Sequence, residues 1–213
     1  DVYYASFQVP DLLYSVLLVG AISTAFIPVF AGYFRRDRDD AWRVASGVFA
    51  LFSIVFVVLA LAAIVFAPQL MRVVVPGFTG ERFTTAVELT RIMFLSPVLF
   101  GLANVLASVL QYFRRFFVVS AAPVLYNVGI IVGALVFVPR FGFRGLAWGV
   151  VLGAVLYFAL HMVGLKGLGF RWRFDRSMLH PGVRRIIRQT LPRAVGVAVN
   201  QLSSIVIVMI ASS

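Results

Sequence analysis

Polar side chains inside long apolar runs are the residues of this sequence that could do chemistry. A charge or an amide in hydrocarbon is costly unless it faces other protein groups or a water-filled cavity, so such residues often mark substrate or ion pathways. The candidates, in chain order, are Asp1, Asp11, Tyr14, Glu88, Arg91, Asn127 and Gln201.

Several of these residues also have a purely structural interpretation. Glu88 and Arg91 are three residues apart, so they can form a salt bridge on one face of a helix. The amides of Asn127 and Gln201 are typical of hydrogen bonds that join two membrane helices. For these four residues a structural role and a cavity role both stay open.

The first apolar run has an unusual composition. Asp1 and Asp11 lie near one end, where they could reach lipid headgroups, and Tyr14 is of a type that more often packs than binds. Gly20 opens a run of small residues that ends at Pro28. Small residues permit close helix contact, and proline is tolerated in lipid where neighbours satisfy the freed carbonyl. The sequence therefore predicts a helix that packs closely or bends there.

Known catalytic patterns are absent from the sequence. His161 and His180 are the two histidines, with no nearby carboxylates at a metal-ligand spacing, and there is no cysteine. No glycine-rich phosphate loop or nucleophile motif occurs. We therefore expect no enzyme activity, no metal and no cofactor. A helical bundle with scattered buried polarity is typical of a transporter or channel.

The composition predicts an all-α, polytopic membrane protein. The 213 residues are 62% hydrophobic and 13% charged, with a mean hydropathy of +0.99. Asp1 stands in place of an initiator methionine and the last apolar run reaches the end, so we expect part of a longer protein. Six runs are long enough to cross a bilayer, at about 3–33, 42–66, 84–113, 117–138, 145–165 and 191–211.

The basic residues predict the orientation of the six spans. Fourteen of them fall in the connections on one side and five on the other, which places the richer side in the cytoplasm. The net charge of +11 is therefore explained by topology and lipid headgroups, and no nucleic-acid partner is expected. The linker at 166–190 becomes amphipathic, as expected of a helix lying on an anionic leaflet or of a solvated connection.

Glycines predict where two spans meet. Gly145, Gly149 and Gly153 recur every four residues, and Gly129 and Gly133 repeat that spacing in the preceding span. Small residues at this interval line one helix face and allow backbones to approach.

The order of several short motifs resembles one known family. They are Asp1-x5-Phe7-x2-Pro10-Asp11, Gly20 to Phe30, Pro76-Gly77-Phe78, Arg91-Ile-Met-Phe94, Gln111-x3-Arg115-Phe116, Ala122-Pro123-x3-Asn127, Gly145-Leu-Ala-Trp148, Pro192 and Gln201. In this order they resemble the MurJ (MviN) lipid II flippases of the multidrug/oligosaccharidyl-lipid/polysaccharide exporter superfamily. The resemblance covers essentially the whole chain.

The resemblance implies helices two to seven of an alternating-access transporter with about fourteen helices. Residues 1–165 would form most of the N-terminal lobe, 166–190 the cytoplasmic linker and 191–213 the first helix of the second lobe. The implied protein lies in the bacterial cytoplasmic membrane and moves lipid II from the inner to the outer leaflet. Coupling to an ion or to the membrane potential, and contacts with anionic lipids and cell-wall synthesis proteins, are further expectations.

The resemblance also implies a cavity lined by cations. Arginine suits a diphosphate because its planar fork can bond two oxygens. Asp1 matches an acidic cavity position of the family, whereas Tyr14 stands where the family has an arginine. We expect Tyr14 to line that cavity, with the phosphate held by Arg91 or by arginines elsewhere in the protein.

Three other functions remain open from the sequence. Another exporter of the superfamily would carry a lipid-linked polysaccharide or a drug, and a drug exporter should place acidic residues deep in its spans. A membrane-embedded polyprenyl-phosphate transferase should gather carboxylates or histidines at one interface. A structural membrane scaffold would have no water-filled cavity.

Overall fold

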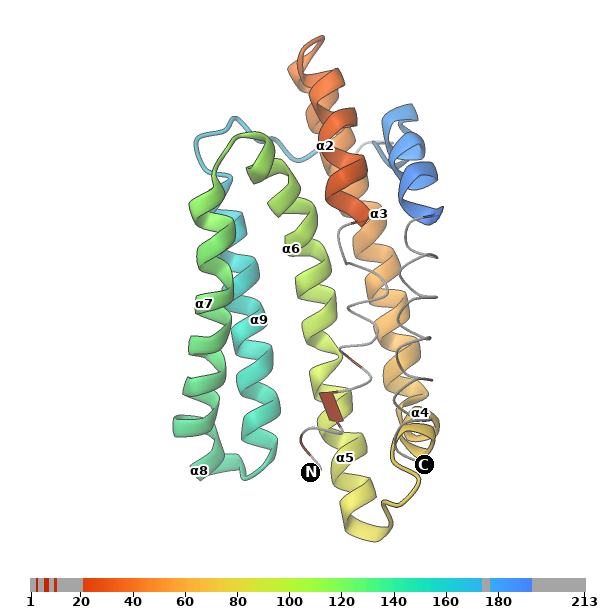
Figure 1. Ribbon diagram of the computed structural model, residues 1–213, viewed down its shortest axis with the longest axis vertical. Helices are drawn as coiled ribbons and strands as arrows, with labels where there is room; N and C mark the ends of the chain where they lie inside the picture. Colours follow the sequence, from red (N-terminus) through yellow and green to blue (C-terminus); the bar gives the residue numbers. More distant parts are fainter. Residues whose placement is uncertain (1–2, 4–5, 8–9, 11–20, 174–176, 193–213) are drawn as a thin grey trace, which may run out of the picture.

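The fold is a bundle of long helices, seen in a computed structural model that describes residues 3, 6–7, 10, 21–173 and 177–192 (Figure 1). Within these residues there is no strand, as the predicted all-α class requires. The helices are α2 (Ala21–Phe34), α3 (Arg38–Val65), α4 (Ala67–Val74), α5 (Gly80–Met93), α6 (Leu95–Tyr112), α7 (Phe116–Val132), α8 (Val138–Phe141), α9 (Arg144–Gly164) and a helix over 181–192. A π-helical turn, Gly133–Phe137, joins α7 to α8, and a 3-10 turn, Ser177–Leu179, precedes the last helix.

Four helical stretches are long and apolar enough to cross a membrane. They are Arg38–Val65, Gly80–Tyr112, Phe116–Phe141 and Arg144–Gly164, and they correspond to four of the six predicted spans. The shorter apolar helix Ile22–Phe34 belongs to the first predicted span. Most of the sixth, at 191–211, lies outside the described residues.

The span predicted at 84–113 is two helices that meet at Phe94. α5 ends at Met93, and α6 begins at Leu95. Pro97 has no N–H to donate to the carbonyl of Met93, and its ring disfavours a straight helix there. Pro97 therefore explains the break, which a prediction from the length of the apolar run does not detect.

The two ends of the bundle differ in charge. The α2–α3 turn, the α6–α7 turn, residues 165–173 and the helix over 181–192 lie at one end, whereas α4, α8 and the start of α5 lie at the other (Figure 1). The connections between helices therefore fall at the two ends as the count of basic residues predicted. We call the first of these the arginine-rich end.

Aromatic rings pack the contact between α2, α3 and α6. Phe30 is fully buried, and its ring centroid lies 5.1–6.4 Å from those of five other rings. Offset and edge-to-face contacts of this kind are worth more than the burial of their area. This aromatic cluster comprises Phe26, Phe30, Phe34, Trp42, Tyr112, Phe113 and Phe170.

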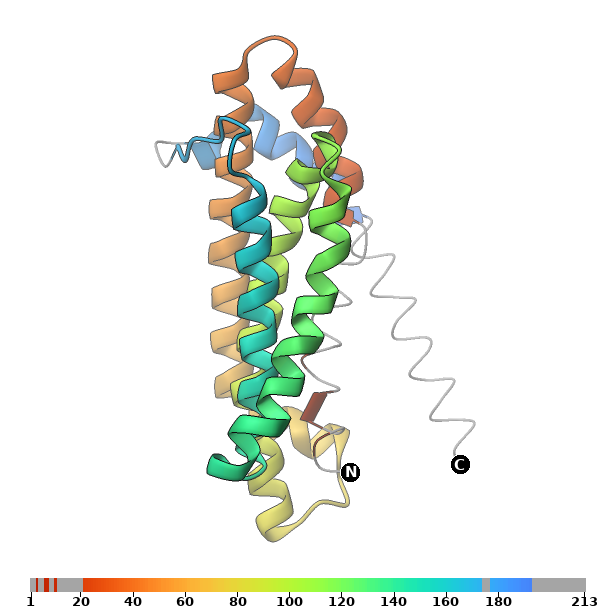
Figure 2. The same cartoon turned by 90° about the vertical axis from the view of Figure 1, so that its left-hand side faces the viewer.

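Glycines pack the contact between α7 and α9. A Cβ added to Gly129 would overlap the backbone of Gly153, and one added to Gly133 would overlap that of Gly149. Gly145 lies against the backbone of Phe137 in the π-helical turn. The two helices run alongside each other over most of their length (Figure 2). These five glycines form the glycine seam.

The linker folds back onto α3. The hydroxyl of Ser46 accepts a hydrogen bond from the N–H of Arg173 at 3.1 Å, and Arg173 pairs with Asp39 at 3.0 Å. A Cβ on Gly47 would overlap the backbone of Ser177. His180 Nε2 lies 3.1 Å from a carboxylate oxygen of Asp40. The linker is therefore anchored to the first turns of α3 by polar contacts and close packing.

Candidate functional site

A cavity opens between the helices near the proline break. It lies where α5 and α6 face α7 and α9, with a volume of about 260 Å³. Its described lining residues are Phe7, Pro10, Met93, Ser96, Pro97, Phe100, Pro123, Tyr126, Val150 and Tyr157.

The lining is aromatic and apolar, with hydroxyl groups as its polar component. The ring of Phe100 packs edge-on against those of Tyr126 and Tyr157, at 5.0 and 5.1 Å. The hydroxyl of Ser96 is buried and has no hydrogen-bond partner among the described residues. Charged side chains are absent from the described lining. Such a cavity suits an apolar chain or a neutral group, and its described lining offers a phosphate no cation.

Arg91 lies outside this cavity. Its side chain is exposed, and Nε donates to the carbonyl of Ile64 at 3.2 Å. That carbonyl is in the last turn of α3, where backbone acceptors lack partners within the helix and a cation is favourable. In this structure Arg91 therefore joins α5 to the end of α3.

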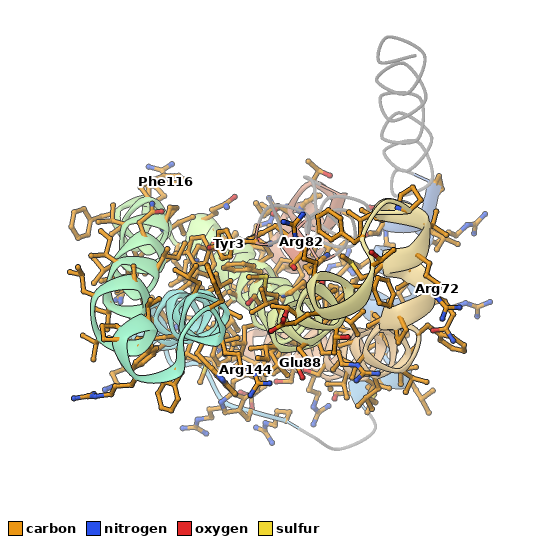
Figure 3. All side chains as sticks on the ribbon, turned by 90° about the horizontal axis from the view of Figure 1, so that it is seen from below. Tyr3, Arg72, Arg82, Glu88, Phe116 and Arg144 are labelled. Atoms are coloured by element: carbon orange, nitrogen blue, oxygen red, sulfur yellow. The ribbon has the colours of Figure 1, made fainter. Side chains whose placement is uncertain are left out.

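The salt bridge that the sequence left open between Glu88 and Arg91 does not form in the described structure. Glu88 instead pairs with Arg144 at the start of α9, with its carboxylate 2.6 Å from Nη2 and 3.0 Å from Nε (Figure 3). Both side chains are largely exposed. Spacing along one helix favoured Arg91, but the bundle brings α9 alongside α5, and the arginine of that neighbour reaches the carboxylate.

The interhelical hydrogen bond that the sequence favoured for the amide of Asn127 is likewise not formed in the described structure. Its side-chain amide donates to the carbonyl of Pro123, one turn earlier in the same helix, at 3.0 Å. The residue is exposed and does not line the cavity, although Pro123 and Tyr126 beside it do. A polar side chain within a helix can hydrogen-bond to the carbonyl four residues earlier in the same helix, so its amide needs no partner on a neighbouring helix.

Pro28, predicted to mediate helix packing, is exposed. It lies within α2 and borders a groove at the arginine-rich end. The remaining predicted residues lie outside the described part of the chain: Asp1, Asp11, Tyr14, Gly20 and Gln201.

The aromatic residues of the cavity were missed at the level of sequence. Phe100, Tyr126 and Tyr157 fit an apolar span, so nothing distinguishes them from ordinary packing residues. A usable signal is the tyrosine hydroxyl, because a tyrosine within a span needs a hydrogen-bond partner there. Among the described residues there is no group of histidine, cysteine or carboxylate side chains that could hold a metal ion.

Comparisons with known proteins agree with this architecture. The family model described as "Lipid II flippase MurJ" matches residues 1–213. The lipid II flippase MurJ of Burkholderia cenocepacia is 32% identical over 221 aligned residues, which cover 100% of this chain and 43% of that protein. The probable lipid II flippase MurJ of Rhizobium tropici is 29% identical, with 100% and 42% covered.

A solved structure shares the fold. "Lipid II flippase MurJ, inward closed conformation" superposes with a TM-score of 0.77 at 21% identity, covering 96% of this chain and 42% of that one. The chain thus spans less than half the length of the relatives that it matches.

The helical bundle and its apolar spans define an all-α, polytopic membrane protein. Within that class, the match over all of its residues shows that the chain belongs to the lipid II flippase MurJ family.

Proposed function

We propose that the protein to which this chain belongs moves lipid II from the inner to the outer leaflet of the bacterial cytoplasmic membrane by alternating access. The observation that carries the proposal is the family match over residues 1–213. The named relatives are lipid II flippases or probable lipid II flippases.

The distribution of charge agrees with a transporter of an anionic lipid. Among the described residues, Asp39 lies in the first turn of α3, and Glu88, within α5, is paired with Arg144 at the start of α9. A drug exporter for cationic substrates would instead need acids deep within its spans. The cations that bind the diphosphate would come from positions outside the described residues, and the described helices would form the scaffold beside them.

The proposal can be tested with the full-length gene. The gene is expressed in a bacterium whose own lipid II flippase can be depleted, and the measured quantity is lipid II accessible to an external probe. Rescue of growth together with restored external lipid II is expected. A matched control is Gly149→Leu, which should prevent folding.

Two results would contradict the proposal. One is a full-length protein that is folded in the membrane but restores neither growth nor external lipid II. The other is restoration of a different surface polysaccharide without peptidoglycan, which favours another exporter of the superfamily.

We also propose that transport is coupled to an ion gradient or to the membrane potential. Charged groups that move relative to the membrane respond to its potential. Dissipating each gradient with a selective ionophore in the same depletion strain should slow the appearance of external lipid II; unchanged rates under all ionophores would contradict the coupling.

A further inference from the structure

A second hollow lies at the arginine-rich end, where α2 meets the helix over 181–192. Its volume is about 190 Å³. Its described lining residues are Pro28, Val29, Gly32, Tyr33, Arg36, Arg185 and Gln189. We call it the arginine groove.

Two guanidinium groups line this groove. Arg36 and Arg185 come from different elements, and no acidic side chain is among the described lining residues. Neither arginine forms a salt bridge in the described structure. Guanidinium groups are well suited to phosphate, because each can donate two parallel hydrogen bonds.

The carboxylates between α2 and the first turn of α3 are engaged elsewhere. Asp37 accepts a hydrogen bond from the N–H of Asp39 at 2.8 Å and caps α3. Asp39 pairs with Arg173 at 3.0 Å, and Asp40 contacts His180 at 3.1 Å. The positive charge of Arg36 and Arg185 is therefore not neutralised by the adjacent turn.

The groove has room for a ligand, and its side chains are the available donors. A Cβ added to Gly32 would meet nothing within 4 Å. The first amides of the helix over 181–192 are already occupied, since Gly182 donates to His180 Nδ1 and Val183 to the carbonyl of His180. A bound anion would thus be held by the two arginines and the amide of Gln189.

The groove is polar at one end and apolar at the other. Exposed Pro28 and mostly buried Val29 lie about 7–9 Å back along α2 from its last residue, Phe34, towards the middle of the span. An anion with an attached hydrocarbon chain matches both parts. A free phosphate would use only the arginines.

We propose that the arginine groove binds the phosphate headgroup of an anionic bilayer lipid, with its acyl chain along Pro28 and Val29. The proposal does not depend on which substrate the complete protein carries. A lipid held there would join α2 to the linker helix across the arginine-rich end.

The test uses the purified full-length protein in an uncharged detergent. The measured quantity is the rise in the thermal unfolding midpoint during titration with phosphatidylglycerol, compared with phosphatidylcholine of the same chains. A ligand that binds the folded state raises this midpoint in proportion to the logarithm of its excess over Kd. Phosphatidylglycerol should raise it at lower concentrations than phosphatidylcholine.

Two variants test the site and one serves as control. Arg36→Gln with Arg185→Gln should increase the phosphatidylglycerol concentration needed for a given shift about tenfold, since two charge-assisted contacts are lost. Gly32→Leu fills the groove, keeps both charges and should weaken binding to a similar extent. The control, Arg35→Gln with Arg188→Gln, removes two exposed charges from the same elements. It should change the phosphatidylglycerol concentration needed for a given shift less than about twofold.

Three results would overturn the proposal. Equal losses in the groove variant and the control would mean general attraction to a basic surface. Inorganic phosphate that competes at concentrations similar to the lipid would mean a site for the free anion. Binding of a polyprenyl diphosphate without binding of phosphatidylglycerol would mean a site for another lipid.

Discussion

The aromatic cluster and the glycine seam hold helices together in opposite ways. In the first, large rings such as Phe30 and Trp42 fill the space between α2, α3 and α6. In the second, Gly133 and Gly149 leave out side chains altogether, so that the backbones of α7 and α9 meet. Between membrane helices, association depends on close packing more than on the hydrophobic effect. Both regions achieve that packing, but they should differ in how they fail.

Gly149→Leu should break the glycine seam and have the largest effect. The new side chain would overlap the backbone of Gly133, which cannot turn away as a side chain can. We expect a loss of more than about 4 kcal/mol, visible as absence of folded full-length protein in detergent.

Gly32→Ala is the matched control for the seam. It also adds a side chain to a helical glycine, but only a methyl group and into open space. The unfolding midpoint should stay the same or rise slightly, because alanine favours the helix. A folded Gly149→Leu variant with a midpoint like that of Gly32→Ala would refute backbone contact at the seam.

Phe30→Ala should damage the aromatic cluster without abolishing the fold. It leaves a hole among five rings, and we expect a cost of about 3–5 kcal/mol. Thermal unfolding of the full-length protein measures it. Phe117→Ala, at a ring that is 84% exposed, is the control and should cost little; equal losses at both positions would argue against the cluster.

Arg91→Gln separates a structural role from a transport role. Loss of the bond to the Ile64 carbonyl should cost about 1 kcal/mol of stability, and exposed Arg140→Gln is the control. If the resemblance-based cavity role applies, external lipid II in the depletion assay should fall much more than this stability loss explains. If stability and external lipid II both decrease slightly and to a similar extent, Arg91 has only a structural role.

The Glu88–Arg144 pair should contribute least. Exposed ion pairs typically contribute about 0.2–1 kcal/mol, so neither Glu88→Gln nor Arg144→Gln should approach the effect of Phe30→Ala. A double-mutant cycle on unfolding midpoints, at low and high salt, measures their coupling. Coupling of several kcal/mol, insensitive to salt, would show that polar pairs rather than packing join α5 to α9.

The sequence predicted the parts of this fold that depend on local composition. Runs of apolar residues located four described spans, and the four-residue spacing of Gly145, Gly149 and Gly153 identified a face that does meet its neighbour. Charge counts grouped the connections into two ends. These properties belong to a helix by itself or to two consecutive helices.

Contacts between elements far apart in the chain could not be predicted in this way. Glu88 finds Arg144, 56 residues away, because of how α5 and α9 lie in the bundle. Asn127 turns to its own helix. In the sequence, the tyrosines that line the cavity cannot be distinguished from tyrosines that face lipid or pack between helices. Hydropathy locates a helix but does not fix its rotation or its neighbours, which decide these contacts.

The anchored linker has a consequence for synthesis of the protein. The hydroxyl of Ser46 accepts a hydrogen bond from the N–H of Arg173, which lies 127 residues later in the chain. At about 5–20 residues per second, a ribosome needs roughly 6–25 seconds to supply it. During that interval the linker contacts of Ser46 and Gly47 on α3 are not made, and water or a lipid headgroup can occupy that surface until the linker arrives.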